Sequence, residues 1–252
     1  MGHIISVHSF RRGVGKSNTT ANVATLLAAA GQRVGVIDTN TQSPSLHILF
    51  NLNEDRIVYW LNDYLDSKCS MTQAAHNITK QLNIPVKGEI FIVPANPDTN
   101  SVAKMLHGGY DTSLLVAGFY ELMEDLALDI LMLDTGAGLD EDTLPAIAVA
   151  DTLAILLRHD QRDYQGTSVI VEVARKLAVA HILLIINEVP STLDLTDVTA
   201  QVKQAYNCEI AGLLPYSEDL TTFATPGLFA LNHPDHEMTH RFTQIAQILS
   251  AS

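Results

Sequence analysis

The sequence predicts an α/β protein with a doubly wound, mostly parallel sheet and helices on both faces. Short apolar runs alternate with longer segments whose apolar residues recur at helical spacing, the pattern of repeated strand–helix units. No linker, internal repeat or low-complexity segment interrupts this alternation. A chain of 252 residues is long enough to bury the core of one such domain. We therefore expect residues 1–252 to form a single domain.

The first strand–helix–strand unit is defined most clearly. Residues 4–7 form an apolar run, residues 16–30 are rich in Ala and Leu, and residues 33–37 form a second apolar run. Gly31 follows the helical segment, where a glycine cap is typical. Two short strands that flank one helix are expected to lie parallel, with their carboxyl ends at the same edge of the sheet.

The alternation continues along the rest of the chain, with one irregular stretch. Residues 46–82 are expected to be helical but irregular, and another helical stretch follows Asp98. The remaining strands are predicted at 89–93, 130–133, 152–157, 181–186 and 209–214, and the remaining helices at about 114–128, 165–177, 193–206 and 237–249.

Composition excludes several classes of protein. A hydrophobic fraction of 47% with only 17% charged residues excludes a disordered chain, and the net charge of −13 argues against a generally basic nucleic-acid-binding surface. Cys69 and Cys208 are far apart in the sequence and are expected to be reduced thiols of a cytoplasmic protein. No apolar run approaches the ~18 residues of a transmembrane helix, and the N-terminus lacks the pattern of a signal peptide.

The segment Arg11–Ser17, which reads RRGVGKS, is typical of a phosphate-binding loop between a strand and a helix. Glycines let backbone N–H groups turn toward an anion, and the helix N-terminus adds its positive end. Lys16 would reach the β- and γ-phosphates, and the Ser17 hydroxyl would hold Mg²⁺. The standard pattern G-x-x-x-x-G-K-[ST] requires a glycine at position 10, where this chain has Phe10.

This loop resembles the deviant Walker A motif, K-G-G-x-G-K-[ST], of the ParA/MinD family of P-loop ATPases. The residues that match the motif are Gly13, Gly15, Lys16 and Ser17. Arg11 stands at the signature lysine and Arg12 at the first glycine. The resemblance implies a P-loop NTPase fold, ATP and Mg²⁺ as cofactors, and a nucleotide-sandwich dimer in which Arg11 reaches the partner's phosphates. Arginine keeps the positive charge and adds a fork suited to phosphate; the alternative is two solvated arginines.

The run Ile130–Asp134 is typical of a Walker B strand, a buried strand that carries one carboxylate to its end. A carboxylate there can position Mg²⁺ beside Ser17. The following residues resemble the second switch of the ParA/MinD family, in which the N–H of Gly136 would sense the γ-phosphate. The alternative for Asp134 is that it caps a turn between a strand and a helix.

Asp38 follows the predicted strand at residues 33–37. The resemblance implies a catalytic role for it, because the family places a carboxylate here to orient the attacking water, and such a group contributes roughly 10²–10⁴ in rate. The family pattern Asp-x-Asp-Pro-Gln is only partly kept: Asn40 and Thr41 replace the Asp and Pro, while Gln42 matches. The alternative is a turn-forming Asp38.

Asn187 follows the predicted strand at residues 181–186. An amide offers a donor and an acceptor to the edge of a purine, and the resemblance implies that Asn187 reads adenine together with backbone near Pro215. GTPases carry Asn-Lys-x-Asp, but the last position here is Pro190, so ATP is favoured over GTP. A turn-forming Asn187 is the alternative. The resemblance also implies nucleotide contacts from the loop, at Gly13, Val14, Gly15, Lys16, Ser17 and Asn18.

The function implied by the resemblance is a slow ATPase, stimulated by an adaptor or activator protein, that dimerises with Mg-ATP and positions or partitions intracellular cargo. Non-specific DNA is a candidate surface, although the available basic residues are sparse: Arg175, Lys176, Lys203 and Arg241. The chain shows no basic amphipathic membrane-targeting tail, no cluster-binding cysteines near the second switch and no C-terminal tyrosine cluster. These absences separate it from other branches of the family.

Two rival functions remain open at this point. An ATP-binding regulatory module with little or no hydrolysis is favoured by the departures at Arg12, Asn40 and Thr41. A metabolic enzyme that transfers phosphate to a small acid would need a substrate signature, and the sequence shows none.

Overall fold

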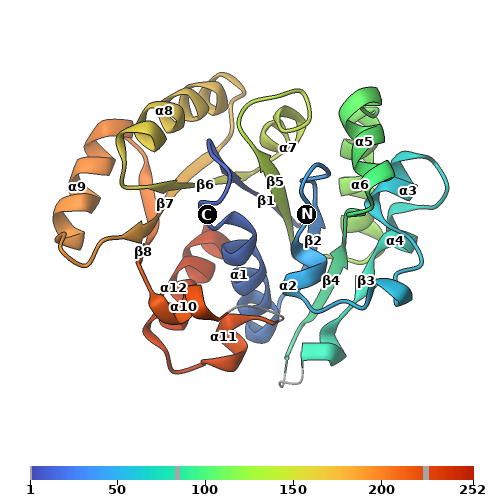
Figure 1. Ribbon diagram of the computed structural model, residues 1–252, viewed down its shortest axis with the longest axis horizontal. Helices are drawn as coiled ribbons and strands as arrows, with labels where there is room; N and C mark the ends of the chain where they lie inside the picture. Colours follow the sequence, from blue (N-terminus) through green and yellow to red (C-terminus); the bar gives the residue numbers. More distant parts are fainter. Residues whose placement is uncertain (1, 83–85, 224–226) are drawn as a thin grey trace.

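The computed structural model describes residues 2–82, 86–223 and 227–252 (Figure 1). Within these residues, the strands are β1 (His3–Ser9), β2 (Arg33–Asp38), β3 (His76–Asn77), β4 (Glu89–Val93), β5 (Ile130–Ala137), β6 (Thr152–Arg158), β7 (His181–Val189) and β8 (Glu209–Pro215). They form one sheet in the order β3-β4-β2-β5-β1-β6-β7-β8. All neighbouring pairs are parallel except β3 and β4. The predicted mostly parallel sheet is confirmed.

Helices connect these strands across both faces of the sheet. The longer helices are α1 (Lys16–Ala30), α5 (Thr99–Gly108), α6 (Thr112–Asp125), α8 (Gln161–Lys176), α9 (Leu195–Tyr206) and α12 (Glu237–Ala251). The shorter ones are α2 (Leu46–Leu49), α3 (Leu61–Leu65), α4 (Met71–Ala74), α7 (Leu144–Ala148), α10 (Glu218–Thr222), α11 (Phe229–Asn232) and the 3₁₀ helices η1 (Glu54–Arg56) and η2 (Thr79–Leu82). Among the described helices, none has both the length and the hydrophobicity needed to cross a bilayer.

The central strands are buried on both faces, which explains their nearly continuous apolar sequences. On β1, Ile5 belongs to a core cluster with α1 and α12, whereas its neighbour Ile4 belongs to a cluster with α6. A third cluster packs α8 and α9 against β6 and β7. Figure 1 shows α1 and α12 on one side of the central strands and α7 and α8 on the other.

Helix α1, which follows the phosphate loop, is largely buried. It ends at Gly31, whose φ of 118° is left-handed and whose N–H donates to the Ala28 carbonyl, as the sequence predicts. Two of its buried polar side chains have partners inside the protein: Thr25 donates to the Ala21 carbonyl, and Asn22 accepts from the Ala230 N–H of α11. The helix is therefore tied to α11 as well as packed in the core.

The structure corrects several predicted boundaries. Residues 46–82 include the short strand β3 as well as short helices, because a two-residue strand leaves no periodic pattern in the sequence. Helix α8 begins at Gln161 rather than at 165, because Asp160 caps it by accepting from the N–H groups of Arg162 and Asp163. The short helices α7, α10 and α11 carry too few residues to be predicted from periodicity.

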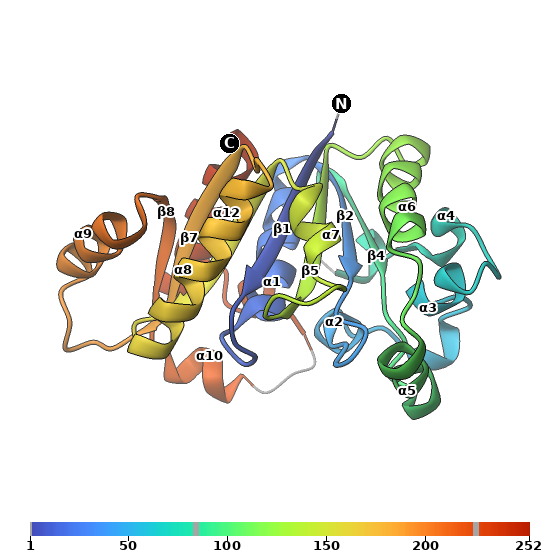
Figure 2. The same ribbon diagram turned by 90° about the horizontal axis from the view of Figure 1, so that it is seen from above.

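The fold brings the carboxyl ends of its parallel strands to one edge. The loop after β1, Asp38 at the end of β2 and Asp134 within β5 meet there, beside residues that end β6, β7 and β8. Figure 2 shows the loop between β1 and α1 at the edge opposite the N-terminus. Ligands of open α/β sheets bind at this edge, where the chain crosses from one side of the sheet to the other.

Candidate functional site

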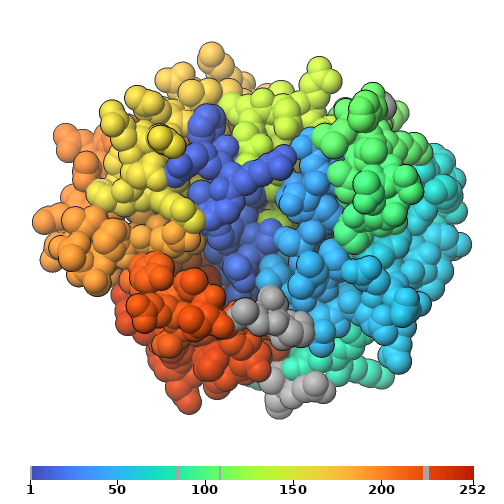
Figure 3. Space-filling view, in the orientation of Figure 1, coloured from blue at the N-terminus to red at the C-terminus, as the bar shows by residue number. Residues whose placement is uncertain are grey.

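The phosphate loop is shaped by two glycines with left-handed backbones, Gly13 (φ 75°) and Gly15 (φ 92°). A Cβ atom on Gly15 would lie 2.4 Å from Asn187 Nδ2, so a side chain does not fit there. The loop leads into α1, whose first N–H groups face its concave side. In the space-filling view, the blue N-terminal segment that carries the loop reaches the surface between the red and light-blue segments (Figure 3). The loop is therefore both preformed and accessible.

Lys16, the first residue of α1, is buried, with only 8% of its surface exposed. Its Nζ donates to Ser9 Oγ at 3.1 Å, and burial lowers its pKa, an effect that nearby Asp134 opposes. An ammonium group held in this position by the loop's own strand can bind an anion without rearranging the backbone.

Asp38 and Asp134 are register partners on the neighbouring strands β2 and β5, and neither has exposed surface. Asp134 accepts from Ser17 Oγ at 2.6 Å and from Thr20 Oγ1 at 3.1 Å. Asp38 accepts three backbone N–H groups of the following loop, those of Asn40, Ser45 and Leu46. The structure thus brings the predicted magnesium residues Ser17 and Asp134 together and places the predicted catalytic Asp38 beside them.

Burial raises the pKa of both carboxyl groups, and the adjacent Asp134 raises the pKa of Asp38 further. Two carboxylates side by side in a buried site repel each other unless a proton or a cation lies between them. Ser17 and Asp134 offer hard oxygen ligands of the kind Mg²⁺ prefers, with phosphate oxygens and water to complete an octahedron. The donor set therefore fits Mg²⁺.

Asn187 lies under the phosphate loop. It is 7% exposed, its Nδ2 donates to the Val14 carbonyl at 2.8 Å, and its Oδ1 accepts from the Glu188 N–H at 2.9 Å. These contacts make Asn187 a brace for the loop, a role that the sequence interpretation did not include. Its role in reading adenine stays a prediction.

Two adjoining pockets open beside the loop. One, of about 110 Å³, is lined by Asn187, Pro215, Tyr216 and Phe242 among others; the second, of about 410 Å³, is lined by Arg12, Lys16 and Ser17 among others. Gly15, Asn18 and Glu188 line both. Together the pockets form one groove, with the phosphate loop at one end and predicted adenine contacts at the other.

The loop between Asp38 and α2 faces Gly136. A small pocket between them is lined by Arg12, Asn40 and Gly136 among others, and Arg12 Nη2 donates to Gln42 Oε1 at 2.9 Å. Arg12 therefore links the phosphate loop to the loop that follows Asp38. The same pocket places the loop after Asp38 beside Gly136 of the predicted second switch.

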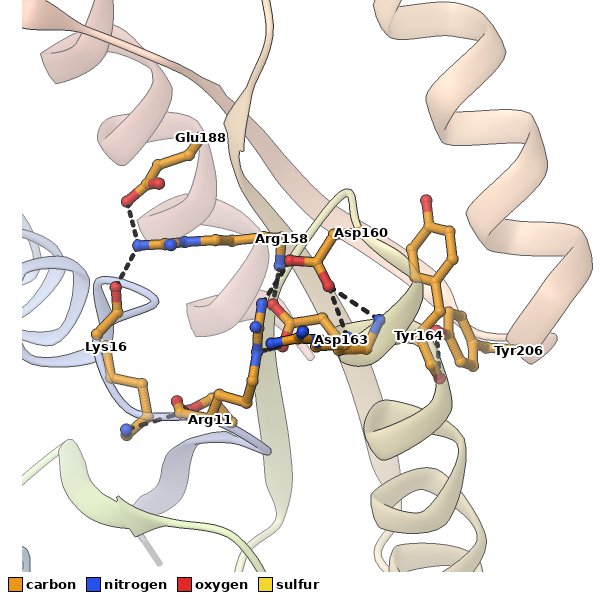
Figure 4. Close-up of polar contacts among 11 residues, drawn as sticks. Arg11, Lys16, Arg158, Asp160, Asp163, Tyr164, Glu188 and Tyr206 are labelled. Atoms are coloured by element: carbon orange, nitrogen blue, oxygen red, sulfur yellow. Dashed lines mark hydrogen bonds and ion pairs between the residues drawn. The ribbon is translucent and has the colours of Figure 1, made fainter.

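Arg11 does not extend into solvent. Its guanidinium makes ion pairs with Asp160 and Asp163, at the N-terminus of α8 (Figure 4). Asp163 is almost fully buried, at 1% exposure, and also accepts from the backbone N–H of Arg158 at 2.8 Å. In this chain on its own, Arg11 is held by its own α8, so the predicted contact with a partner's phosphates requires these ion pairs to break.

Sequence reasoning missed three charged residues beside the loop. Arg158 Nη2 donates to the Gly13 carbonyl and pairs with Glu188 Oε1 at 2.8 Å, while Asp163 holds Arg11 (Figure 4). A usable signal existed, since Arg158 ends β6 and Glu188 lies near the end of β7, at the same edge as the predicted site.

His8, near the end of β1, is also buried beside the loop. Its Nδ1 lies 2.7 Å from Thr135 Oγ1, and burial, reinforced by nearby Lys16, lowers its pKa to about 3. The imidazole is therefore neutral near neutral pH and adds no charge to the anion-binding loop.

Asp38→Asn tests the repulsion between the two buried carboxyl groups. Because the folded-state pKa of Asp38 is raised, the folded protein keeps a proton that the unfolded chain releases above about pH 4, so stability falls as the pH rises. Relative to wild type, the nucleotide-free variant should gain at least about 1 kcal/mol of unfolding free energy between about pH 5 and about pH 8. Urea unfolding at a series of pH values measures this.

The exposed Asp55→Asn, in η1, serves as the control and should change the unfolding free energy by less than about 0.5 kcal/mol. A pH-independent difference for Asp38→Asn would contradict the raised pKa.

Comparison with known proteins identifies relatives of the whole chain. A family model described as the CobQ/CobB/MinD/ParA nucleotide binding domain matches residues 5–227. The septum site-determining protein MinD of Thermotoga maritima is 25% identical over 254 residues, covering 98% of this chain and 88% of that protein. A putative septum site-determining protein MinD of Emiliania huxleyi is 27% identical over 235 residues, covering 90% and 79%.

Solved structures share the fold. The MinC:MinD cell division protein complex of Aquifex aeolicus matches with a TM-score of 0.82 and 19% identity, covering 100% of this chain and 96% of that chain. MinD of Pyrococcus horikoshii, in a complex with Mg-ADP, matches with a TM-score of 0.81 and 18% identity, covering 99% and 96%. The family match spans most of the described residues, including the phosphate loop, Asp38, Asp134 and Asn187. The chain belongs to the CobQ/CobB/MinD/ParA family of nucleotide-binding domains.

Proposed function

We propose that the protein is an ATPase that dimerises with Mg-ATP and acts as a switch in positioning or partitioning cargo inside the cell. The observation that carries this proposal is the cluster of Lys16, Ser17, Asp38 and Asp134 around a preformed phosphate loop. The groove beside it leads to Asn187 and Pro215. A putative plasmid partition protein of Borrelia burgdorferi bound to AMPPNP, which shares the fold at a TM-score of 0.75, supports ATP as the nucleotide.

Each residue of the cluster has a role in this proposal. Lys16 and the loop N–H groups bind the β- and γ-phosphates, while Ser17 and Asp134 hold Mg²⁺. Mg²⁺, when bound, neutralises charge that develops on the phosphate oxygens. Asp38 orients a water molecule for attack on the γ-phosphorus, so that the bond to the bridging oxygen breaks and ADP leaves with phosphate.

The dimer step depends on Arg11. In the proposed sandwich, its guanidinium leaves Asp160 and Asp163 and moves to the partner's phosphates. The phosphate oxygens then take the place of the two carboxylates as its anionic partners. This exchange lets nucleotide compete with α8 for one side chain, and hydrolysis would return Arg11 to α8. An adaptor protein that stimulates hydrolysis would set the lifetime of the dimer. Non-specific DNA is a candidate for the surface that the dimer binds.

A second candidate function is an ATP-binding regulatory module with little or no hydrolysis. The contact of Arg12 with Gln42 favours it, since this contact fixes the loop after Asp38 to the phosphate loop. ATP turnover that disappears in Asp38→Ala would exclude this candidate, whereas bound ATP without turnover in the wild type would favour it.

Light scattering with Mg-ATP and with Mg-ADP tests the switch directly. We expect Asp38→Ala to form a stable dimer with Mg-ATP only, because it binds the nucleotide and does not hydrolyse it. We expect Arg11→Ala to stay monomeric with either nucleotide. Arg162→Ala, an exposed arginine in the first turn of the same α8, is the matched control and should behave as wild type. Monomers throughout, with ATP still bound, would contradict the proposal.

Asp160→Ser tests whether Arg11 must leave α8. Serine keeps the helix cap but removes one of the two carboxylates that hold Arg11. We expect its Mg-ATP-dependent dimer to form with a dissociation constant about three- to fivefold lower than that of wild type, as for the loss of a partly exposed ion pair. Sedimentation measures the constant.

Asp194→Ser is the matched control for this variant. Asp194 caps α9 with the same two kinds of backbone contact, to Thr196 and Asp197, and pairs with no arginine among the described residues. Equal dissociation constants for Asp160→Ser and Asp194→Ser would show that the ion pairs of Arg11 do not restrain dimerisation.

A further inference from the structure

Glu188 lies where the two pockets of the nucleotide groove meet. A nucleotide that puts its phosphates on the loop and its base near Asn187 must place its ribose across the wall that both pockets share. That wall consists of Gly15, Asn18 and Glu188. Of these, only Glu188 carries a group that accepts hydrogen bonds through two oxygens and donates none. Ribose hydroxyls are donors, so the chemistry of the shared wall matches the sugar.

The backbone at Glu188 is distorted in a way that presents this side chain to the groove. Glu188 has a φ of 53°, in the left-handed backbone region that residues other than glycine rarely adopt. The pairing of β7 with β8 shifts register between Ile186 and Val189, so the strand is irregular at this residue. Irregularities of this kind redirect side chains at functional sites. The N–H of Glu188 is held by Asn187 Oδ1, which fixes the distortion to the loop brace.

Arg158 holds Glu188 and balances its charge. Its Nη2 lies 2.8 Å from Glu188 Oε1 and also donates to the Gly13 carbonyl of the phosphate loop (Figure 4). Without this partner, a carboxylate in the groove would repel the triphosphate. Within the part of the chain that the structure describes, Glu188 Oε1 is the oxygen engaged by Arg158, which leaves Oε2 for a ligand. Both side chains are little more than one-third exposed, at 37% and 39%.

We infer that Glu188, positioned by Arg158, accepts hydrogen bonds from the ribose hydroxyls of the bound nucleotide. This inference rests on the proposed nucleotide site and adds to it a residue that distinguishes ribonucleotides from nucleotides lacking these hydroxyls. An acidic side chain on the ribose hydroxyls is a known solution for nucleotide recognition in other α/β folds.

Calorimetric titration with ADP and with 2′,3′-dideoxy-ADP, both with Mg²⁺, tests the inference without hydrolysis. We expect the wild type to bind ADP about tenfold more tightly, the effect of one hydrogen bond to a charged group. Glu188→Ala should bind both nucleotides equally, with the affinity of the wild type for the dideoxy form. Glu188→Gln, which keeps an acceptor oxygen without the charge, should show an intermediate preference. Glu172→Ala, an exposed glutamate on α8, is the matched control and should keep the tenfold preference.

Two results would overturn the inference while leaving the proposed nucleotide site intact: equal wild-type affinity for ADP and its dideoxy form, or a tenfold preference that survives in Glu188→Ala. A wild-type protein that binds neither nucleotide would overturn the proposed function and this inference together.

Discussion

The site is built around two carboxyl groups, Asp38 and Asp134, that the sheet forces side by side without solvent. Their register on β2 and β5 leaves no freedom to separate them, since each is the partner of the other across a parallel ladder. Such a pair is costly unless hydrogen bonds, a shared proton or a cation offset the repulsion. The surrounding residues supply the hydrogen bonds: Ser17 and Thr20 from α1 on one side, and three backbone N–H groups on the other.

This constraint connects the phosphate loop to the loop after Asp38. Ser17 and Lys16 are consecutive residues of α1, so the residue that contacts Asp134 and the residue that would bind phosphate move together. The loop after Asp38 is held by the Asp38 carboxylate, which accepts from the N–H groups of Ser45 and Leu46. A cation bound by Asp38 and Asp134 would therefore affect both the phosphate loop and the loop after Asp38 through direct contacts.

Positive charge gathers at this edge of an otherwise acidic protein. The chain has a net charge of −13, yet Arg11, Arg12, Lys16 and Arg158 all lie in or beside the phosphate loop. Two of them are held by carboxylates, Arg11 by α8 and Arg158 by Glu188. Pairing with carboxylates keeps the positive charges of the empty groove from repelling one another.

Much of this arrangement could be predicted from the sequence, because local patterns encode it. The sheet follows from the alternation of apolar runs. The meeting of Ser17 with Asp134 follows from the phosphate loop and the Walker B carboxylate lying at the carboxyl ends of two neighbouring parallel strands. The ion pairs of Arg11 could not be predicted, since they join residues 149 and 152 positions apart that only the packing of α8 beside the loop brings together. The contact of Asn187 with Val14 was missed for the same reason, because an amide that could read a base could equally brace a loop.

The most direct test of the account is the proton balance of Mg-ADP binding, which involves no hydrolysis. Calorimetry near neutral pH, in buffers of different ionisation enthalpy, measures the protons that leave the protein when the ligand arrives. If Mg²⁺ replaces a proton shared by Asp38 and Asp134, binding releases protons from the wild type and fewer from Asp38→Asn. Equal proton release by the two proteins, or none from the wild type, would contradict the claim that this buried pair is the site's charge-sensitive centre.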